Sequence, residues 1–184
     1  TLIALAVARQ GAVGTAVKNH GIQGRASPLV GYCSEQGHSS LVKAFQMLGL
    51  GSDALRPVAV NDDFSLNTDS LADAVERDRR AGATPFCVIA TVGTVNTGAI
   101  DPLRRIQAFC EQEQLWLHVD AAFGGAVALL PEFEEALKGV EKADSLAFDF
   151  HKWFQVPYAA GALLVKDAAL HQATFSERGE YLAT

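Results

Sequence analysis

The sequence lacks several features that would assign it to familiar classes of protein. No apolar run approaches the ~20 residues that a helix needs to cross a bilayer, which argues against a membrane-spanning protein. Positive charge is not in excess: the formal net charge of −6 argues against nucleic-acid and anionic-membrane partners, which require a positive face. No complete dinucleotide fingerprint follows a predicted strand, and no phosphate-loop GK[ST] motif is present, so a nucleotide site is disfavoured.

Cysteine is scarce as well. The three cysteines, Cys33, Cys87 and Cys110, are far apart, odd in number and surrounded by apolar residues. Such a pattern does not suit a disulfide framework or a zinc site. We expect buried free thiols in a reducing compartment, and therefore a cytoplasmic protein.

The composition is that of an ordinary globular domain. Of the 184 residues, 49% are hydrophobic and 20% are charged, which is enough to form one domain with a real core. The first residue, Thr1, falls within a predicted amphipathic helix that has no basic segment before it, so it is a poor signal peptide. We expect the chain to be a fragment whose N-terminal elements are missing.

Helix and strand patterns alternate along the chain. The predicted helices are 2–18, 39–48, 68–81, 102–114, 132–137 and 168–174. The predicted strands are 29–34, 56–60, 86–92, 115–119, 145–150 and 160–165. This alternation indicates an α/β fold with a mostly parallel sheet and helices on both faces. In such folds ligands bind beyond the carboxyl ends of the strands.

One lysine stands in an unusual setting. Lys152 lies between His151 and Trp153, at the end of a short apolar run. An amine among aromatic and imidazole groups is partly desolvated, which favours its neutral, nucleophilic form and the formation of a Schiff base with a carbonyl. The alternative is that the stem of Lys152 packs on Trp153 while its ammonium reaches water.

A carboxylate stands near the end of a predicted buried strand. Asp120 is followed by Ala121 and Ala122, whose small side chains leave room for a flat group. A structural ion pair with an arginine, or a cap for the next helix, are the alternatives for this carboxylate. His118 lies two residues before Asp120, but no third ligand accompanies the pair, so we do not predict a metal site.

An aspartate at a strand end, a flat cavity and a lysine flanked by aromatic residues together suit pyridoxal phosphate. The lysine holds this cofactor as a Schiff base, and the aspartate keeps the pyridine nitrogen protonated. The protonated ring then accepts the electron pair that remains on the substrate's Cα when CO2 leaves. These residues therefore suit the decarboxylation of an amino acid.

Four motifs resemble, in order and spacing, the pyridoxal-phosphate-dependent amino-acid decarboxylases, the group that includes aromatic-L-amino-acid, tyrosine and glutamate decarboxylases. The motifs are SEQGHSS (34–40), ATVGTVNTG (90–98) with Asp101, HVDAA (118–122) and DFHKW (149–153). The similarity runs from Thr1 to about Lys166. It implies the fold of the aspartate-aminotransferase-like (fold type I) large domain.

The resemblance implies a role for each matching residue. Lys152 would form the Schiff base, and Asp120 would bind the pyridinium nitrogen. His38 would stack on one face of the ring while Ala122 packs on the other, and His151 would lie near the cofactor phosphate. Lys152, His38 and Asp120 are thus the expected catalytic residues. The alternative for His38 is a loop imidazole that caps the helix after it.

Two positions depart from the family pattern. Many members carry a second threonine in the central loop, where this chain has Val95 after Thr94, so no cofactor contact is expected from Val95. Many also carry Asn-Pro before the His-Lys pair, where this chain has Asp149-Phe150. A phosphate contact by Asp149 is in doubt, because two anions repel.

The resemblance predicts that residues 1–184 form most of a cofactor-binding large domain that works as a homodimer. A phosphate-binding loop would precede Thr1, and a small C-terminal domain would follow Thr184. The function we expect is decarboxylation of an L-amino acid to its amine. Another fold-type-I reaction, such as transamination, and an inactive dimerisation domain are the alternatives. The sequence does not name the amino acid.

Overall fold

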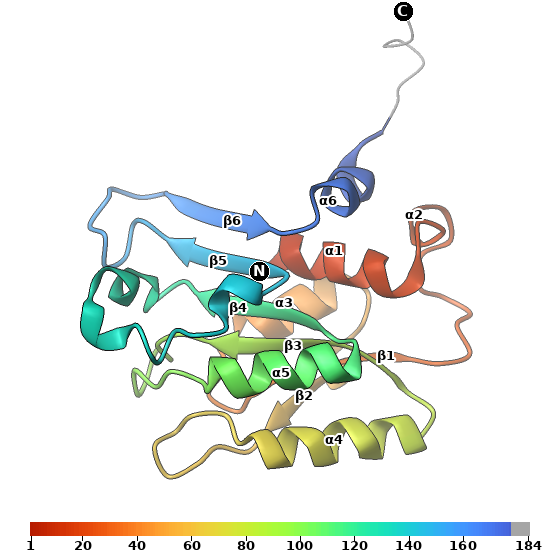
Figure 1. The fold of residues 1–184 in the computed structure, drawn as a ribbon. Coiled ribbons are helices and arrows are strands. Elements are labelled where there is room, and N and C mark those ends of the chain that lie inside the picture. The colour runs from red at the N-terminus through yellow and green to blue at the C-terminus, as the bar shows by residue number, and fades with distance from the viewer. Residues whose placement is uncertain (178–184) are drawn as a thin grey trace, which may run out of the picture.

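A six-stranded sheet runs through the middle of the molecule, between two layers of helices (Figure 1). The structure is a computed structural model that describes residues 1–177. The strands are β1 (Leu29–Ser34), β2 (Leu55–Val58), β3 (Thr84–Thr91), β4 (Trp116–Ala121), β5 (Ser145–Asp149) and β6 (Gly161–Val165). Their order is β2-β1-β3-β4-β5-β6, and every neighbouring pair is parallel except β5 with β6.

Helices cover both faces of this sheet. They are α1 (Leu2–Val13), α2 (Val17–His20), α3 (Ser40–Met47), α4 (Thr68–Arg80), α5 (Leu103–Glu113) and α6 (Ala168–Phe175). Four short 3-10 turns are η1 (Ser52–Ala54), η2 (Gly125–Leu129), η3 (Pro131–Phe133) and η4 (Val140–Lys142). The predicted fold class, a mostly parallel α/β sheet with helices on both faces, is confirmed.

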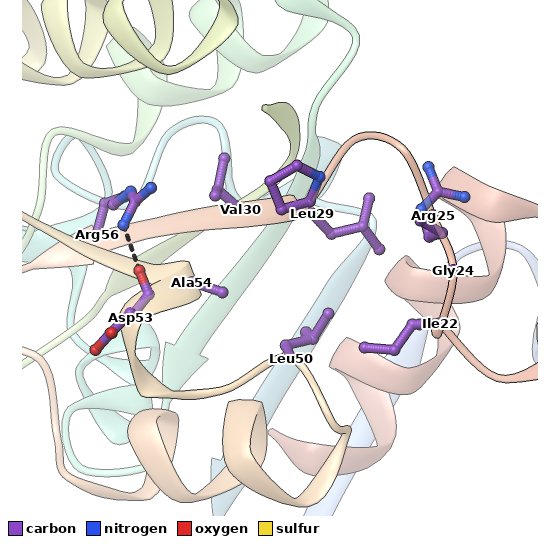
Figure 2. Close-up of a pocket in the computed structure, with 10 residues that line it drawn as sticks. Ile22, Gly24, Arg25, Leu29, Val30, Leu50, Asp53, Ala54 and Arg56 are labelled. Atoms are coloured by element: carbon purple, nitrogen blue, oxygen red, sulfur yellow. Dashed lines mark hydrogen bonds between the residues drawn. The ribbon is translucent and has the colours of Figure 1, made fainter. Parts of the chain in front are cut away.

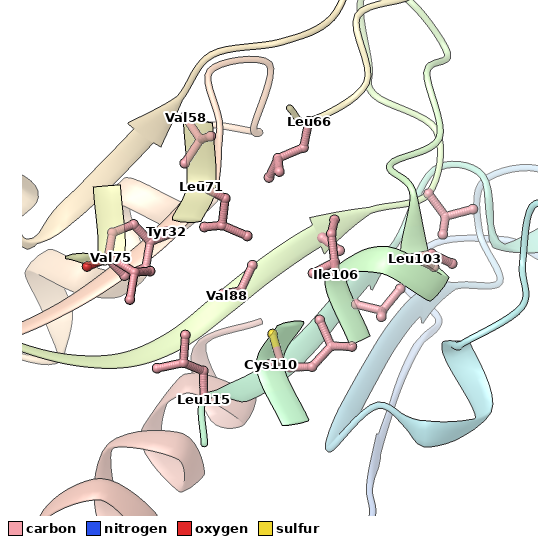
Figure 3. Close-up of a cluster of buried hydrophobic side chains, with 14 of the residues drawn as sticks. Tyr32, Val58, Leu66, Leu71, Val75, Val88, Leu103, Ile106, Cys110 and Leu115 are labelled. Carbon is pink, nitrogen blue, oxygen red and sulfur yellow. The ribbon is translucent and has the colours of Figure 1, made fainter. Parts of the chain in front are cut away.

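The side chains of strand β3 pack against the helix layers on both faces of the sheet. Alternate side chains of a strand point to opposite faces of a sheet. Cys87 and Ile89 enter the cluster formed with α1 and α3. Val88 and Ala90 enter the cluster formed with α4 and α5, in which Figure 3 shows Val88. All four side chains are fully buried. The nearly continuous apolar run of β3 is therefore that of a strand covered on both faces.

Two predicted helices are wrong in part. The first was expected to reach residue 18 but ends at Val13, because Gly14 adopts φ 79° and breaks it, and α2 follows separately. Residues 132–137 were expected to form a helix, but only the 3-10 turn η3 forms there. Amide-to-carbonyl bonds such as Glu134 to Pro131 and Lys138 to Glu135 span three residues, so the segment winds in successive tight turns.

The ends of the strands differ from prediction by one or two residues, as is usual. Strand β2 stops before Val60, which instead makes an isolated bridge to Leu66. Strand β4 continues through Asp120, so this residue lies on the strand. Strand β5 stops at Asp149, which places Lys152 in the turn that follows.

The predicted state of the cysteines is confirmed. Cys33, Cys87 and Cys110 are free and buried. Burial raises the pKa of the Cys33 and Cys110 thiols to about 12, so these groups stay protonated. Within residues 1–177, no helix is both long and apolar enough to span a bilayer.

Candidate active site

A cavity of about 710 Å³ opens at the carboxyl ends of the central strands. Its volume is within the range of small-molecule sites, ~300–1,000 Å³. The walls come from the start of α1, the loop before α3, the ends of β3 and β4, the start of β6 and the turn after β5. Its ionisable side chains are His38, Lys43, Asp120, Asp149 and Lys152. Four of the five predicted site residues, all but His151, line this cavity.

Asp120 lies at the floor of the cavity. It is 7% exposed, and its Oδ1 atom accepts a hydrogen bond from the Ala122 amide at 3.1 Å. Among residues 1–177 no ion pair involves Asp120, so the arginine-pair alternative finds no support. The carboxylate does cap the turn after β4, and this use of Oδ1 leaves Oδ2 as an acceptor for a ligand.

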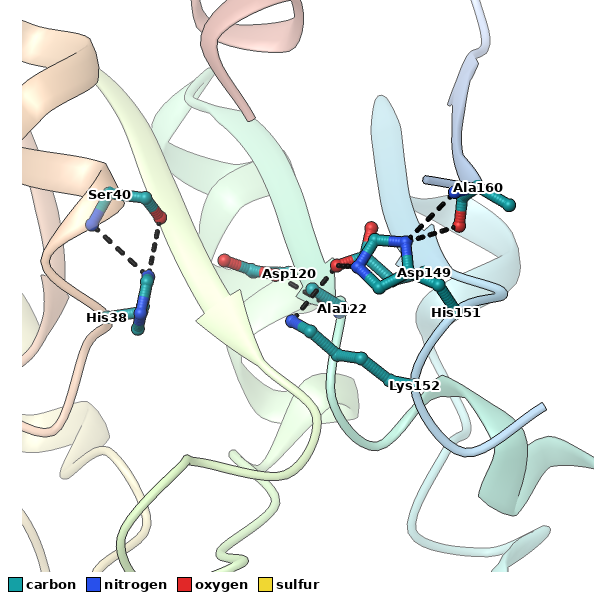
Figure 4. A network of polar contacts seen from close by, with 8 residues as sticks. All are labelled: His38, Ser40, Asp120, Ala122, Asp149, His151, Lys152 and Ala160. Carbon is teal, nitrogen blue, oxygen red and sulfur yellow. Dashed lines mark hydrogen bonds and ion pairs between the residues drawn. The ribbon is translucent and has the colours of Figure 1, made fainter. Parts of the chain in front are cut away.

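His38 reaches the cavity from the loop between β1 and α3. Its Nδ1 atom accepts the Ser40 amide hydrogen at 3.2 Å and lies 2.9 Å from the Ser40 hydroxyl (Figure 4). The alternative role for His38, a loop imidazole that caps the helix after it, is supported, because the ring accepts the first amide hydrogen while the Ser39 side chain makes no capping bond. Since Nδ1 is an acceptor, the neutral ring carries its hydrogen on Nε2. The capping and cofactor-facing roles are thus compatible.

Lys152 is held by a carboxylate. Its Nζ atom lies 3.0 Å from Asp149 Oδ2, and its side chain is 32% exposed. Trp153, the neighbour of Lys152 in the sequence, packs edge-on against Phe123 at 5.1 Å between ring centroids. The desolvation of the amine by aromatic neighbours stays a prediction. The turn after β5 brings Asp149 and Lys152 together, since the Lys152 amide donates to the Asp149 carbonyl at 3.4 Å.

His151 lies beside the cavity and does not line it. Its Nδ1 atom is 2.8 Å from the Ala160 carbonyl oxygen, and its ring stacks on Tyr158 at 4.3 Å. Its Nε2 atom faces Asp149 Oδ2 at 3.7 Å. The phosphate contact that the resemblance implies for His151 stays a prediction.

His118 is fully buried on the strand that carries Asp120. Its Nδ1 atom lies 2.9 Å from the Ser145 hydroxyl, which also accepts a hydrogen bond from the Trp116 indole at 2.8 Å. Burial lowers the pKa of His118 to about 3, so the ring is neutral at physiological pH. Within residues 1–177 no three His, Cys, Asp or Glu side chains gather as metal ligands.

The central loop is fastened by a different carboxylate, Asp101. Its two oxygens accept the amide hydrogens of Leu66 and Thr91, each at 2.7 Å, and the residue is 1% exposed. Burial raises the pKa of Asp101 to about 6. Asp101 therefore fixes the backbone at the end of β3. In the loop that follows this strand, Val95 lines the cavity, and its side chain is 56% exposed.

A second cavity, of about 350 Å³, lies at the start of β1 and β2 (Figure 2). Three charged residues, Arg25, Asp53 and Arg56, line it, and the Arg56 side chain is already paired. Its Nε atom lies 3.2 Å from Asp78 Oδ2, and its NH1 group donates to the Asp53 carbonyl. Asp78 also accepts a hydrogen bond from the Tyr32 hydroxyl at 3.0 Å. This network links β1, β2 and α4, so the Arg56 side chain holds structure.

The carboxyl-end cavity has groups for a specific kind of ligand. Lys152 supplies an amine for an aldehyde, Asp120 supplies an anion for a ring nitrogen, and the His38 ring lies within the same cavity. Ala122, on the cavity wall, leaves room for a flat ring. The residues therefore fit the predicted cofactor. Sequence reasoning missed the Asp149–Lys152 pair, although its three-residue spacing was the available signal.

Comparisons with known proteins agree with this fit. A family model described as "Pyridoxal-dependent decarboxylase conserved domain" matches residues 1–184. Histidine decarboxylase of Drosophila melanogaster is 42% identical over 84% of this chain and 18% of its own length. Tryptophan decarboxylase 2 of Oryza sativa subsp. japonica is 36% identical over 98% of this chain and 36% of its own length.

A solved structure is similar in fold. The crystal structure of Oryza sativa TDC with PLP and tryptamine superposes with a TM-score of 0.87 at 32% identity, over 98% of this chain and 37% of that one. The chain thus spans 18% and 36% of the lengths of the two curated relatives. The similarity covers the sheet and the cavity together.

Proposed function

The chain belongs to the pyridoxal-dependent decarboxylase family, and on that premise we propose that it forms the cofactor-binding part of an enzyme that releases CO2 from an L-amino acid. Pyridoxal phosphate is the cofactor that this family assignment implies. The observation that carries the proposal is the convergence of Lys152, Asp120 and His38 in one cavity at the carboxyl ends of the strands. The inactive-domain alternative is not favoured, because these groups are all present.

Each side chain has a distinct task. The Lys152 amine would attach the cofactor through its aldehyde, and Asp120 Oδ2 would hold the proton on its ring nitrogen. When bound, the cofactor supplies an electron sink for the pair left on the substrate's Cα after CO2 departs. His38 would stack on the ring and present its Nε2 hydrogen to the substrate, with Ala122 on the other side. A preorganised carboxylate of this kind contributes on the order of 3 kcal/mol to a transition state.

The phosphate would lie near the start of α1. Thr1 and Leu2 line the cavity with Asp120, so the amino end of this helix points into the site. Amide groups and the dipole at a helix N-terminus favour a bound anion. We propose that further phosphate contacts come from residues outside 1–184. We also propose that a small C-terminal domain follows this segment.

A homodimer and a cytoplasmic location belong to the same proposal. The relatives are longer than this chain, so residues outside it would complete the substrate site. The relatives' names mention histidine, tryptophan and aromatic amino acids, whose side chains are planar. Phe123 on the cavity wall suits such a side chain. We therefore propose an aromatic or imidazole amino acid as substrate.

The test is a product assay on the full-length protein supplied with pyridoxal phosphate. L-tryptophan, L-tyrosine, L-histidine and L-glutamate would be offered separately, and CO2 and amine would both be measured. We expect equimolar CO2 and amine from at least one planar substrate. A keto acid without CO2 would contradict decarboxylation and favour transamination. Release of CO2 from glutamate alone would contradict the substrate class.

A further inference from the structure

Asp149 carries a charge in the cavity that the reaction above does not use. Its Oδ2 atom lies 3.0 Å from Lys152 Nζ and 3.7 Å from His151 Nε2 (Figure 4). The carboxylate is a quarter exposed, so water screens the pair only in part. One oxygen of Asp149 therefore faces both basic groups of the His-Lys motif.

The position of this carboxylate depends on Gly161. Asp149 ends β5 and pairs across the antiparallel ladder with Gly161, the first residue of β6. A Cβ atom at position 161 would stand 2.8 Å from Asp149 Oδ1, closer than real contacts allow. Gly161 does not have a positive φ, so the requirement is for space and not for backbone freedom. The strand pair therefore makes room for the Asp149 side chain.

The basic partners are fixed by the turn between β5 and β6. The His151 amide donates to the Ala160 carbonyl at 3.1 Å, and the Gln155 amide donates to the Lys152 carbonyl at 3.0 Å. The His151 ring is held to Ala160 through Nδ1, which leaves Nε2 directed toward Asp149. Backbone geometry thus brings the lysine stem and the carboxylate to the same wall of the cavity.

We propose that Asp149 is a positioning residue for Lys152, whose amine it holds against the cavity wall whenever that amine has no carbonyl attached. This inference rests on the proposed function, in which the Lys152 amine would attach the cofactor. An ammonium held by a carboxylate is fixed in direction, and it becomes a nucleophile only after it has given up a proton to water. Asp149 therefore determines both the position of the Lys152 amine and its reactivity.

The other charges around Lys152 are consistent with this division of tasks. His38, Lys43 and Asp120 line the same cavity, and His151 stands behind Asp149. Asp120 uses Oδ1 for the Ala122 amide, and the lysine pairs with Asp149 instead. Asp149 thus pairs with the lysine, and Oδ2 of Asp120 stays available for a ring nitrogen.

The test measures the reactivity of Lys152 in the cofactor-free, full-length protein. Formaldehyde with cyanoborohydride methylates free amines, and peptide mass spectrometry gives the rate at each lysine. We expect Asp149→Asn to accelerate methylation of Lys152 by about two- to five-fold, the range for a partly exposed ion pair. Asp149→Glu, which keeps the carboxylate, restores the wild-type rate. Lys43 lines the same cavity and serves as the internal reference in every sample.

Two further variants separate positioning from a general loss of structure. Gly161→Ala keeps Asp149 but displaces its carboxylate, so Lys152 should again react faster. Asp73→Asn removes an exposed carboxylate on α4 and should change nothing. Unchanged Lys152 methylation in both Asp149→Asn and Gly161→Ala would overturn the inference, as would failure of Asp149→Glu to restore the rate. Because this readout needs no turnover, absence of decarboxylation with an intact methylation pattern would contradict the proposed function alone.

Discussion

The two ends of the sheet carry cavities of different chemical character. At the amino ends of β1 and β2, Arg56 is bonded to Asp78 and to a backbone carbonyl, so its charge serves the fold. At the carboxyl ends, His38 and Asp120 each use one polar atom for a backbone amide and keep another for the cavity. The polar groups at the amino ends of the strands thus stabilise the fold, whereas those at the carboxyl ends keep hydrogen-bonding atoms free for a ligand.

The difference between the two cavities shows how a ligand site can be recognised among buried polar groups. Asp101 and Asp120 are both buried carboxylates near the ends of neighbouring strands. Asp101 accepts one amide hydrogen on each oxygen, so both oxygens are engaged, whereas Asp120 accepts one amide hydrogen on one oxygen only. Burial alone therefore does not mark a functional group, because the unused acceptor is the informative feature.

The largest effect on the carboxyl-end cavity is expected from His38→Phe in the full-length enzyme. Phenylalanine keeps a stacking ring but removes both nitrogens, so cofactor should bind while turnover falls by ~100-fold or more, the size of a lost acid–base group. Absorbance of the bound cofactor and kcat would be measured on the same sample. Full activity would show that the imidazole only caps α3.

Asp120→Asn changes the second group of the carboxyl-end cavity that keeps a free acceptor. The amide keeps the shape of the side chain and its bond to Ala122, but it removes the charge that holds a ring nitrogen protonated. Turnover should fall about 100-fold or more, while cofactor remains bound. Unchanged kcat would mean that Asp120 is as structural as Asp101.

Asp101→Asn should act on stability and not on chemistry. Burial raises the pKa of Asp101 to about 6, above the ~3.9 of an unfolded aspartate, so the folded state binds more protons between these values. The free energy of unfolding should therefore fall as pH rises from about 4 to about 6, by roughly 3 kcal/mol from this group.

Urea unfolding of wild type and Asp101→Asn across this pH window measures the difference. The variant should lose this part of the pH dependence, because the amide does not titrate. Asp73→Asn, an exposed change on α4, is the matched control and should keep the wild-type slope. Parallel curves for wild type and Asp101→Asn would contradict the assignment.

The smallest effect is expected at the amino end. Arg56→Met removes the partner of Asp78 but leaves the Tyr32 hydroxyl bonded to it. Arg56 is partly exposed, but Asp78 is buried and loses one of its two partners, so the loss in free energy of unfolding should be about 1–2 kcal/mol. Turnover should not change. Arg80→Met, which removes an exposed pair within α4, is the control for a solvent-facing arginine. A large loss of turnover in Arg56→Met would break the distinction between the two ends.

Much of the fold could be predicted because local patterns carry it. The apolar run of β3 and the alternation of strands with helices depend on nearby residues and were sufficient for the sheet. The break at Gly14 and the tight turns after Pro131 were not predicted, since each depends on backbone angles that the apolar pattern does not encode. The fold class therefore followed from periodicity, and the element ends did not.

The site was predictable only as a set of residue types. Lys152, Asp120 and His38 were identified from their neighbours, and the structure brings all three to one cavity. The pairing of Lys152 with Asp149 was not predicted, because it requires the space that Gly161 leaves on the adjacent strand. The two hydrogen bonds that Asp101 accepts were not predicted either, because their donors, the amides of Leu66 and Thr91, are distant in sequence.

The most direct test of the account is to locate the cofactor attachment. The full-length protein, loaded with pyridoxal phosphate, would be reduced with borohydride, digested and mapped by mass spectrometry. The account predicts the pyridoxyl group on Lys152, and none in Lys152→Ala. A pyridoxyl group on Lys43, which lines the same cavity, or on Lys142 or Lys166 outside it, would contradict the assignment of Lys152 as the cofactor-binding lysine.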